Sequence, residues 1–202
     1  MGQRIFLGWL VLGFTASALA APAYRELIRL HNQAPALPVQ ALQQGLASYY
    51  RVAVSGLEKK PVLTIIDYRL ASTRKRLWVF DIAHDRLLMH ALVAHGRGSG
   101  KLYAKRFSNR SHSKQSSLGT FVTEGTYIGH AGLSLRLRGL DTSNNRAEQR
   151  SIVVHGARYV NAAFLQKHGY LGRSWGCPAV SVRVAKSLIH TIAGGSVLYA
   201  YF

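Results

Sequence analysis

The chain has 202 residues, of which 48% are hydrophobic and 17% charged, enough for about one domain whose core needs no disulfide or structural metal. Its 26 Lys and Arg against 8 Asp and Glu give a formal net charge of +18, while a mean hydropathy near zero excludes a disordered basic tail protein. The single cysteine, Cys177, excludes an intramolecular disulfide, a C-x-x-C redox pair and a multi-cysteine zinc site.

Residues 1–20 have the pattern of a secretory signal peptide. Arg4 supplies a positive first region, residues 5–14 form an apolar run, and residues 18–20 (Ala-Leu-Ala) form a small-residue cleavage site. The apolar stretch is shorter than the ~20 residues that span a bilayer, so an uncleaved membrane anchor is the weaker alternative. We therefore expect a cleaved signal, no stable membrane span, and a periplasmic or otherwise exported protein.

Residues 21–58 are predicted to form an N-terminal helical segment. A short helix over residues 24–30 is expected to end before Pro35 and Pro38. A second helix is predicted over residues 39–54, where apolar side chains recur every three or four residues. We expect this helical pair to pack against the main domain; a helical binding appendage is the alternative.

Residues 59–202 are predicted to form the main domain, which is mainly β with peripheral helices. Short runs rich in β-branched and aromatic residues, some of them alternating, predict strands at residues 62–68, 77–82, 87–94, 133–137, 152–154 and 196–202. Two stretches with helical spacing, each followed by glycine, predict helices at residues 159–168 and 182–192.

A long glycine- and serine-rich segment, residues 95–117, interrupts the strands. It has no acidic residue and carries six cations: Arg97, Lys101, Lys105, Arg106, Arg110 and Lys114. Irregular segments longer than about 12 to 15 residues are usually functional or disordered. We therefore predict a mobile flap that contacts an anionic ligand, with a solvated basic loop as an equally supported interpretation. We call residues 95–117 the flap segment.

The residues that carry chemistry lie at a strand end and 22 residues after it. His155-Gly156 ends an apolar strand, and Cys177 follows within Arg-Ser-Trp-Gly-Cys-Pro, the nucleophile loop (residues 173–178). A cysteine nucleophile needs a base, a group that orients the base, and donors for the oxyanion. His155 is the predicted base, because a strand end holds it rigidly. Pro178 predicts the first turn of a helix whose dipole would lower the pKa of Cys177.

The stretch 151–177 resembles the catalytic domain of the murein L,D-transpeptidases, the YkuD-like family, whose hallmark is a strand-end His-Gly followed by Ser-x-Gly-Cys. The likeness covers roughly residues 60–202 and implies a mixed β-sheet sandwich. Residues 118–121 resemble the Gly-x-Phe strand of the family. Residues 76–79, 94–100 and 107–109 resemble a branch of the family in which proline follows the nucleophile.

The resemblance implies a role for each residue of the constellation. Cys177 would be the nucleophile, His155 the general base, and the backbone carbonyl of Gly156 the third member of the triad. Ser174 would shape the nucleophile loop. The oxyanion donors would be the backbone amides of Trp175, Gly176 and Cys177.

Two positions depart from the commoner family pattern. Trp175 stands where histidine is usual, and Ala179 where a polar residue, often arginine, is usual. We expect thiol chemistry to survive these changes, with a different preference for donor and acceptor. The residues that could hold the carboxylates of the donor instead are Arg173, Arg158, His95 and Arg97.

The implied reaction is acyl transfer on peptidoglycan stem peptides through a thioester, without cofactor or metal. An amine acceptor gives a cross-link, and water gives an L,D-carboxypeptidase. An anionic wall polymer is the expected second partner. The rivals are a non-catalytic basic wall-binding protein in which Cys177 is buried, and a zinc site formed by His95, His155 and Cys177. A pI of 10.7 also fits nucleic-acid binding, but export argues against it.

Overall fold

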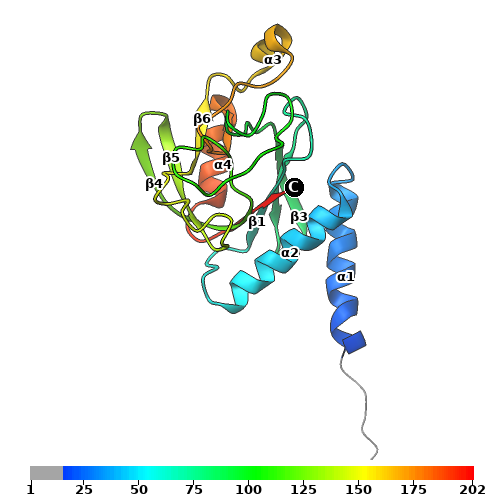
Figure 1. Ribbon diagram of the computed structural model, residues 1–202. Helices are drawn as coiled ribbons and strands as arrows, with labels where there is room; N and C mark the ends of the chain where they lie inside the picture. The colour runs from blue at the N-terminus through cyan, green and yellow to red at the C-terminus, as the bar shows by residue number, and fades with distance from the viewer. Residues whose placement is uncertain (1–15) are drawn as a thin grey trace, which may run out of the picture.

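The computed structural model describes residues 16–202, so the greater part of the predicted signal peptide lies outside the described residues. The elements follow one another as shown in Figure 1. They are α1 (Ala16–Gln33), α2 (Val39–Val54), β1 (Val62–Asp67), β2 (Leu77–Asp81), β3 (Arg86–Ala91), β4 (Gly119–Gly129), β5 (Gly132–Gly139), β6 (Val153–Ala157), α3 (Ala162–His168), β7 (Ala179–Ser181), α4 (Val182–Ile192) and β8 (Val197–Tyr201).

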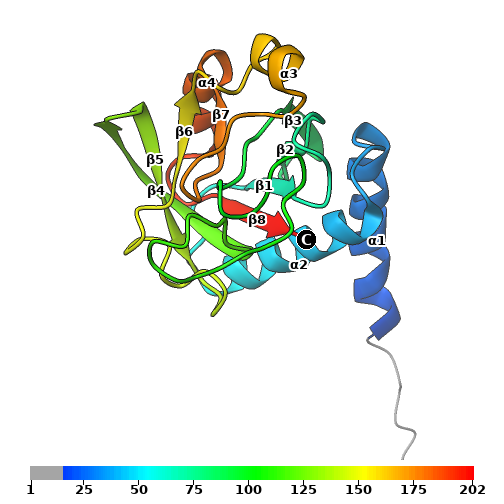
Figure 2. The ribbon, with the colours of Figure 1, turned by 45° about the horizontal axis from the view of Figure 1, so that its top comes forward.

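The eight strands found within residues 16–202 belong to one sheet with the order β3-β2-β1-β8-β4-β5-β6-β7. The pairs β1–β8 and β6–β7 are parallel, and the other pairs are antiparallel. Beyond β3, the N–H of Ala94 donates to the carbonyl of Ala179 in β7 (2.8 Å). This bridge brings the two edges of the sheet together, so the sheet is close to a barrel (Figure 2). The predicted fold class, a mainly β domain with a mixed sheet and peripheral helices, is confirmed.

Strand β1 is buried on both faces, which explains its continuous apolar run. Leu63 and Ile65 point to the face covered by α2, where they share a core with Leu42. Val62 and Ile66 point to the other face and share a second core with the apolar side of α4. Figure 2 shows α2 and α4 on different sides of the sheet.

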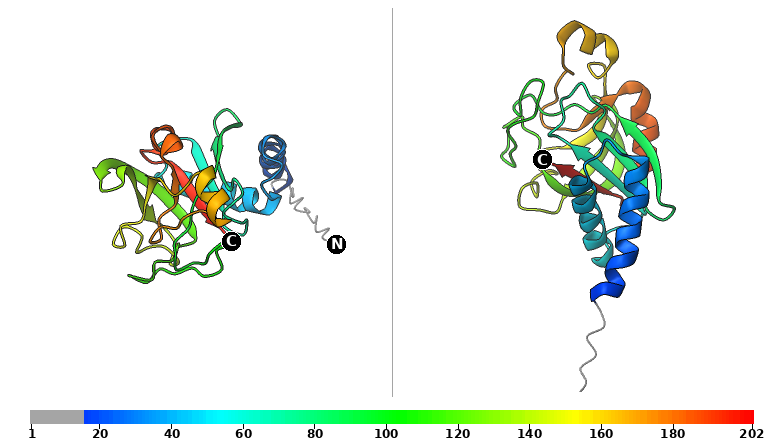
Figure 3. Two further views of the ribbon diagram at one scale, coloured as in Figure 1. Left: turned by 90° about the horizontal axis from the view of Figure 1, so that it is seen from above. Right: turned by 90° about the vertical axis from the view of Figure 1, so that its right-hand side faces the viewer.

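Helix α1 packs beside α2 and reaches the turn between β2 and β3, where Arg29 pairs with Asp85 (2.7 Å). The right-hand view of Figure 3 shows α1 and α2 side by side at one end of the molecule. The expectation that the helical pair packs against the main domain therefore agrees with the contacts seen. Within the described residues, no helix combines the length and apolar character needed to cross a membrane.

The predicted element bounds hold for some helices and differ for others. Helices α2 and α4 have the predicted bounds, whereas α1 starts at Ala16, before the expected start at Tyr24. Helix α3 is shorter than predicted because Asn161 caps it, its side chain accepting from the N–H of Phe164 (2.7 Å).

Candidate active site

The nucleophile loop lies beside strand β6, which carries the candidate base. In the parallel pairing of β6 with β7, His155 is opposite Ala179. Cys177 lies two residues before Ala179 in the chain. The half-buried thiol of Cys177 lies with its Sγ 3.6 Å from the carbonyl oxygen of Ser151, just before β6. The fold thus brings the segment of Cys177 against the strand of His155, although 21 residues separate the two in sequence.

His155 is held by a contact with the next residue. Its Nδ1 lies 2.9 Å from the carbonyl oxygen of Gly156. A proton on Nδ1, donated to this carbonyl, fixes the tautomer and leaves Nε2 unprotonated and able to accept a proton. Helix α4 packs against the backbone of Gly156, where an added Cβ would lie 3.1 Å from that of Ala185. The backbone that orients the ring is therefore held on its other side by a helix.

The prediction that Pro178 opens a helix is wrong. Ala179–Ser181 form the short strand β7, and α4 begins only at Val182. The dipole of α4 therefore does not act on Cys177, since such effects fade within a helical turn. Burial raises the pKa of the Cys177 thiol, against the opposing effects of the Val153 backbone and the Arg150 cation. A thiol of this kind needs a base to become a nucleophile.

Ser174 shapes the nucleophile loop from within. Its hydroxyl donates to the carbonyl of Cys177 (2.6 Å) and accepts from the N–H of Gly176 (3.1 Å). The N–H of Gly176, one of the three predicted oxyanion donors, is thus engaged in the loop itself. Trp175 is 70% exposed, with its ring 5.3 Å from Nζ of Lys114. An exposed aromatic side chain therefore lies two residues before Cys177 in the loop.

Only glycine fits at position 176. Its φ of +131° is unfavourable for other residues. A Cβ at Gly176 would also lie 2.8 Å from the carbonyl oxygen of Gln115 and 2.9 Å from the side chain of Ile152. The close approach of three segments at this point fixes the peptide that precedes Cys177.

His95 is buried and therefore not accessible to a ligand, which argues against the sequence-based expectation that it binds a carboxylate. Its side chain is fully buried, with Nδ1 2.8 Å from Nη2 of Arg76 and Nε2 3.3 Å from the carbonyl of Gly100. Burial, with the nearby Arg76 cation, lowers its pKa to about 4, so the ring is neutral and both nitrogens are occupied. His95 holds the start of the flap segment instead. Sequence patterning does not distinguish such a buried polar pair from an exposed ligand-binding histidine.

The flap segment is joined to the nucleophile loop at several points. The hydroxyl of Ser116 accepts from the N–H of Gly96 (3.0 Å) and donates to the carbonyl of Gly176 (3.1 Å). The N–H of Arg97 donates to the carbonyl of Ser174 (2.7 Å). All six cations of the segment are exposed. The segment therefore presents positive charge outward while its backbone supports the nucleophile loop.

A small cavity of about 280 Å³ lies next to this assembly. It brings together Arg97 and Arg173, two of the four predicted carboxylate-binding residues, while Arg158 is exposed and does not line it. Arg173 donates to the carbonyl of Gly100 (3.0 Å), which fixes the guanidinium. The remaining lining residues are aromatic or small: Tyr159, Phe164, Tyr170 and Gly172. Two guanidinium groups among flat apolar walls suit a carboxylate on a small organic ligand.

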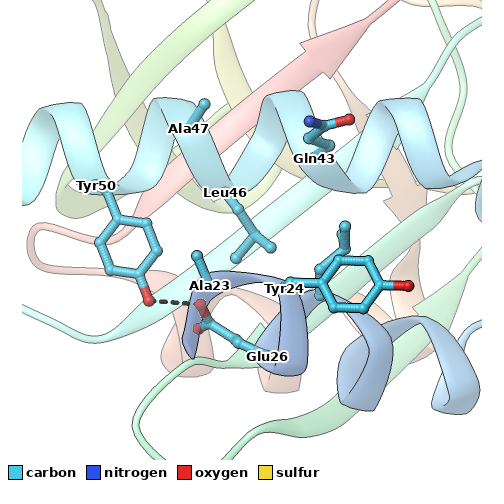
Figure 4. A pocket seen from close by; sticks show the side chains of 8 residues that line it. Ala23, Tyr24, Glu26, Gln43, Leu46, Ala47 and Tyr50 are labelled. Atoms are coloured by element: carbon cyan, nitrogen blue, oxygen red, sulfur yellow. Dashed lines mark hydrogen bonds between the residues drawn. The ribbon is translucent and has the colours of Figure 1, made fainter. Parts of the chain in front are cut away.

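A larger cavity, of about 630 Å³, lies between α1 and α2 and contains neither Cys177 nor His155. Figure 4 shows its lining, in which the hydroxyl of Tyr50 donates to the carboxylate of Glu26 (2.7 Å). Burial raises the pKa of Glu26 despite that hydrogen bond. This cavity is separate from the residues that carry the predicted chemistry.

The sequence pattern does not single out Ser116, which donates to the nucleophile loop, or Arg150, whose guanidinium lies close to Gly176. Neither belongs to a motif, and both are far from Cys177 in sequence, so only the fold reveals them. Across residues 16–202, no three His, Cys, Asp or Glu side chains are grouped so that they could hold a metal ion.

Comparisons with known proteins find L,D-transpeptidases both among family models and among solved structures. The family model of the L,D-transpeptidase catalytic domain (YkuD_2) matches residues 33–201. Similar solved structures include an L,D-transpeptidase from Mycobacterium smegmatis (14% identity, TM-score 0.44, covering 70% of this chain and 59% of that one). Another is Bd1075 of Bdellovibrio bacteriovorus (14% identity, TM-score 0.44, 69% and 47%).

A third similar structure is L,D-transpeptidase 1 of Mycobacterium tuberculosis (12% identity, TM-score 0.38, 69% and 60%). The chain thus spans about half to three-fifths of the length of these proteins. No curated protein matches the chain. Because the family model covers most of the sequence, from the end of α1 to the last strand, the chain belongs to the L,D-transpeptidase catalytic domain family.

Proposed function

We propose that this protein is a cysteine L,D-transpeptidase that acts on peptidoglycan stem peptides through a thioester acyl-enzyme. The observation that carries the proposal is the placement of Cys177 against strand β6, where Nδ1 of His155 contacts the carbonyl of Gly156. A thiol, a base of fixed tautomer and a backbone group that orients the base are the parts that covalent acyl transfer requires.

In the first half-reaction, Nε2 of His155 removes the proton of the Cys177 thiol. The sulfur then bonds to the carbonyl carbon of an L-centred residue joined to D-alanine, and backbone amides of the nucleophile loop hold the oxyanion. Because the N–H of Gly176 is engaged with Ser174, we assign the oxyanion chiefly to the amide of Cys177. The C–N bond then breaks, and D-alanine leaves with the proton held by His155.

In the second half-reaction, an acceptor resolves the thioester. The amine of a second stem peptide attacks the carbonyl carbon, and His155 takes the proton of that amine. The C–S bond then breaks, and His155 returns the proton to the sulfur, which restores the Cys177 thiol. The product is a cross-link. Attack by water instead releases a carboxylate, which is the carboxypeptidase outcome of the same site.

We assign the donor carboxylate to the cavity lined by Arg97 and Arg173. Paired guanidinium groups bind carboxylates with charge-assisted hydrogen bonds. The six exposed cations of the flap segment would increase the rate of encounter with an anionic wall polymer. Arg158 is exposed and does not line this cavity, so we assign it no part in binding that carboxylate.

We propose the domain organisation given by the sequence: a signal peptide (1–20), a helical segment (21–58) and a catalytic domain (59–202). Export to the periplasm or another extracytoplasmic compartment would deliver the enzyme to its substrate. The signal-like pattern of the first residues and the extracytoplasmic setting usual for this family support this assignment.

The test is an incubation of the purified protein with tetrapeptide muropeptides, followed by chromatography and mass spectrometry of the products. Release of D-alanine by the wild type, and not by C177A, supports the proposal. Cross-linked products identify the transpeptidase, and free tripeptides identify the carboxypeptidase. Identical product profiles for both proteins would overturn it and favour a wall-binding module.

A further inference from the structure

Arg150 reaches from the turn before β6 to the flap segment with both ends of its guanidinium. Nη1 donates to the carbonyl of Ser108 (2.6 Å) and to the hydroxyl of Ser117 (2.5 Å). Nη2 donates to the carbonyl of Gln115 (2.6 Å) and the hydroxyl of Ser113 (3.3 Å). One side chain therefore holds four residues of the flap segment, which suits the planar, five-donor guanidinium and not an ammonium group.

The same guanidinium lies close to the peptide that precedes Cys177. A Cβ built on Gly176 would lie 3.3 Å from Nη2 of Arg150, and 2.8 Å from the carbonyl of Gln115 that Nη2 binds. Arg150 thus lies at the junction of the flap segment and the nucleophile loop. Its backbone also leads directly into Ser151, whose carbonyl faces the Cys177 sulfur.

The positive charge of Arg150 has no carboxylate partner. Its four hydrogen-bond acceptors are neutral oxygens, and none of the ion pairs among the described residues includes it. Partial burial lowers the pKa of Arg150, and the nearby Cys177 opposes that effect. A partly buried cation without a counter-ion favours a negative charge nearby, and the Cys177 thiol is a group within its electrostatic reach that can acquire one.

We propose that Arg150 is the positioning residue of the nucleophile: its charge stabilises the Cys177 thiolate, and its forked hydrogen bonds hold the flap segment against the nucleophile loop. This inference rests on the proposed role of Cys177 as nucleophile. Its test needs no substrate, however, so its failure is distinguishable from failure of the proposed function.

The experiment measures the rate of Cys177 alkylation by iodoacetamide as a function of pH, for the wild type and three variants. R150M removes the charge and the donors, R150Q removes the charge but keeps an amide donor, and R150K keeps the charge without the fork. R146M is the matched control, since Arg146 is an exposed cation four residues upstream. Circular dichroism and thermal unfolding check that each variant is folded.

The charge of Arg150 predicts a shift of the alkylation profile toward higher pH in R150M and R150Q. A shift of one pH unit lowers the rate at pH 7 about tenfold. R150K and R146M are expected to keep the wild-type profile. If R150M does not fold, the comparison of R150Q with R150K still isolates the charge.

The fork predicts a second, separate readout. The flap segment carries six trypsin sites, and R150M, R150Q and R150K should all be cleaved there faster than the wild type, whereas R146M should not. Folded R150Q with an unchanged alkylation profile would overturn the stabilisation of the thiolate. An equal shift in R150Q and R150K would also overturn it, because loss of the fork alone would then explain the change.

Discussion

The hydroxyl oxygen of Ser116 lies 3.1 Å from the carbonyl oxygen of Gly176 and donates a hydrogen bond to it, while accepting one from the N–H of Gly96. Ser116 is only 1% exposed, so both bonds are shielded from water. A single hydroxyl thus joins the start of the flap segment to the peptide that precedes Cys177.

We predict that S116A destabilises the protein by about 1–3 kcal/mol, because it leaves a buried N–H and a buried carbonyl without their partner. Urea unfolding measures this change. S111A removes an exposed hydroxyl of the same segment and should change the free energy of unfolding by less than about 0.5 kcal/mol. Equal free energies of unfolding for S116A and S111A would mean that the hydrogen bonds of Ser116 do not contribute to the stability of the protein.

Substitution of Gly176 is predicted to damage the site more than the fold. G176A places a methyl group 2.8 Å from the carbonyl of Gln115 at a φ of +131°, and the strained loop must move Cys177. We expect a loss of activity of about 100-fold or more, since small misplacements of reacting groups have such effects. The measurement is D-alanine release under single-turnover conditions.

The matched control for G176A is G169A. Gly169 also has a positive φ (73°), but a Cβ there meets no other atom. This variant should lose about 1–2 kcal/mol of stability and keep its activity. Full activity in G176A would show that the tight approach at position 176 does not position the thiol.

The buried His95 predicts a dependence of stability on pH. Its pKa in the folded protein is lowered to about 4, whereas an unfolded histidine titrates near 6.5. Below pH 6.5 the unfolded state therefore binds a proton that the folded state refuses. Stability from this residue is complete above pH 6.5 and decreases by about 3 kcal/mol as the pH falls to 4.

H95Q tests this dependence, because glutamine can accept from Arg76 and donate to Gly100 without titrating. Urea unfolding of both proteins at pH 7, 6, 5 and 4 gives the comparison. We expect the wild type to lose about 3 kcal/mol more than H95Q over this range. Parallel curves for the two proteins would contradict the buried neutral state of His95.

Elements with strong hydrophobic periodicity could be predicted from the sequence, whereas elements that depend on long-range contacts could not. The pattern of α2 and α4 is set by one buried face and is visible in the sequence. The three-residue strand β7 has no such signal, because it forms only through its pairing with β6 and with Ala94. Without those partners, Pro178 alone indicates the first turn of a helix.

The same reason explains which parts of the site could be predicted. His155 and Gly156 end a strand, and Cys177 stands in the short Ser-x-Gly-Cys pattern of one loop, so both local patterns are visible in the sequence. His95 was misassigned because its partner Arg76 lies on a different part of the chain. Arg150 was missed because its contacts with the flap segment exist only in the folded protein.

The cavity lined by Arg97 and Arg173, to which we assign the donor carboxylate, predicts an effect on substrate affinity. R173M and R97M each remove a guanidinium from the cavity, and loss of a charge-assisted hydrogen bond of about 1.5–3 kcal/mol raises KM about 10- to 100-fold. R158M removes a cation that lies outside the cavity and should change KM less than about twofold. An equal effect of all three variants would favour general attraction by charge over a defined site.

The helical pair predicts cooperative unfolding with the sheet. Leu42 of α2 is fully buried in the core that includes Leu63 and Ile65 of β1, so L42A should destabilise the whole protein by about 2–5 kcal/mol. V54A truncates a side chain that is 91% exposed and should have little effect. Two separate unfolding transitions in L42A would show that the helical segment folds independently of the sheet.

The central claim is that Cys177 carries the acyl group. The most direct measurement is intact-mass spectrometry of the protein mixed with a tetrapeptide donor and quenched in acid, followed by peptide mapping of any adduct. The account predicts an adduct of the donor without its D-alanine, on Cys177, that is released by hydroxylamine and absent from C177A. Release of D-alanine by C177A, or an adduct on another residue, would contradict it.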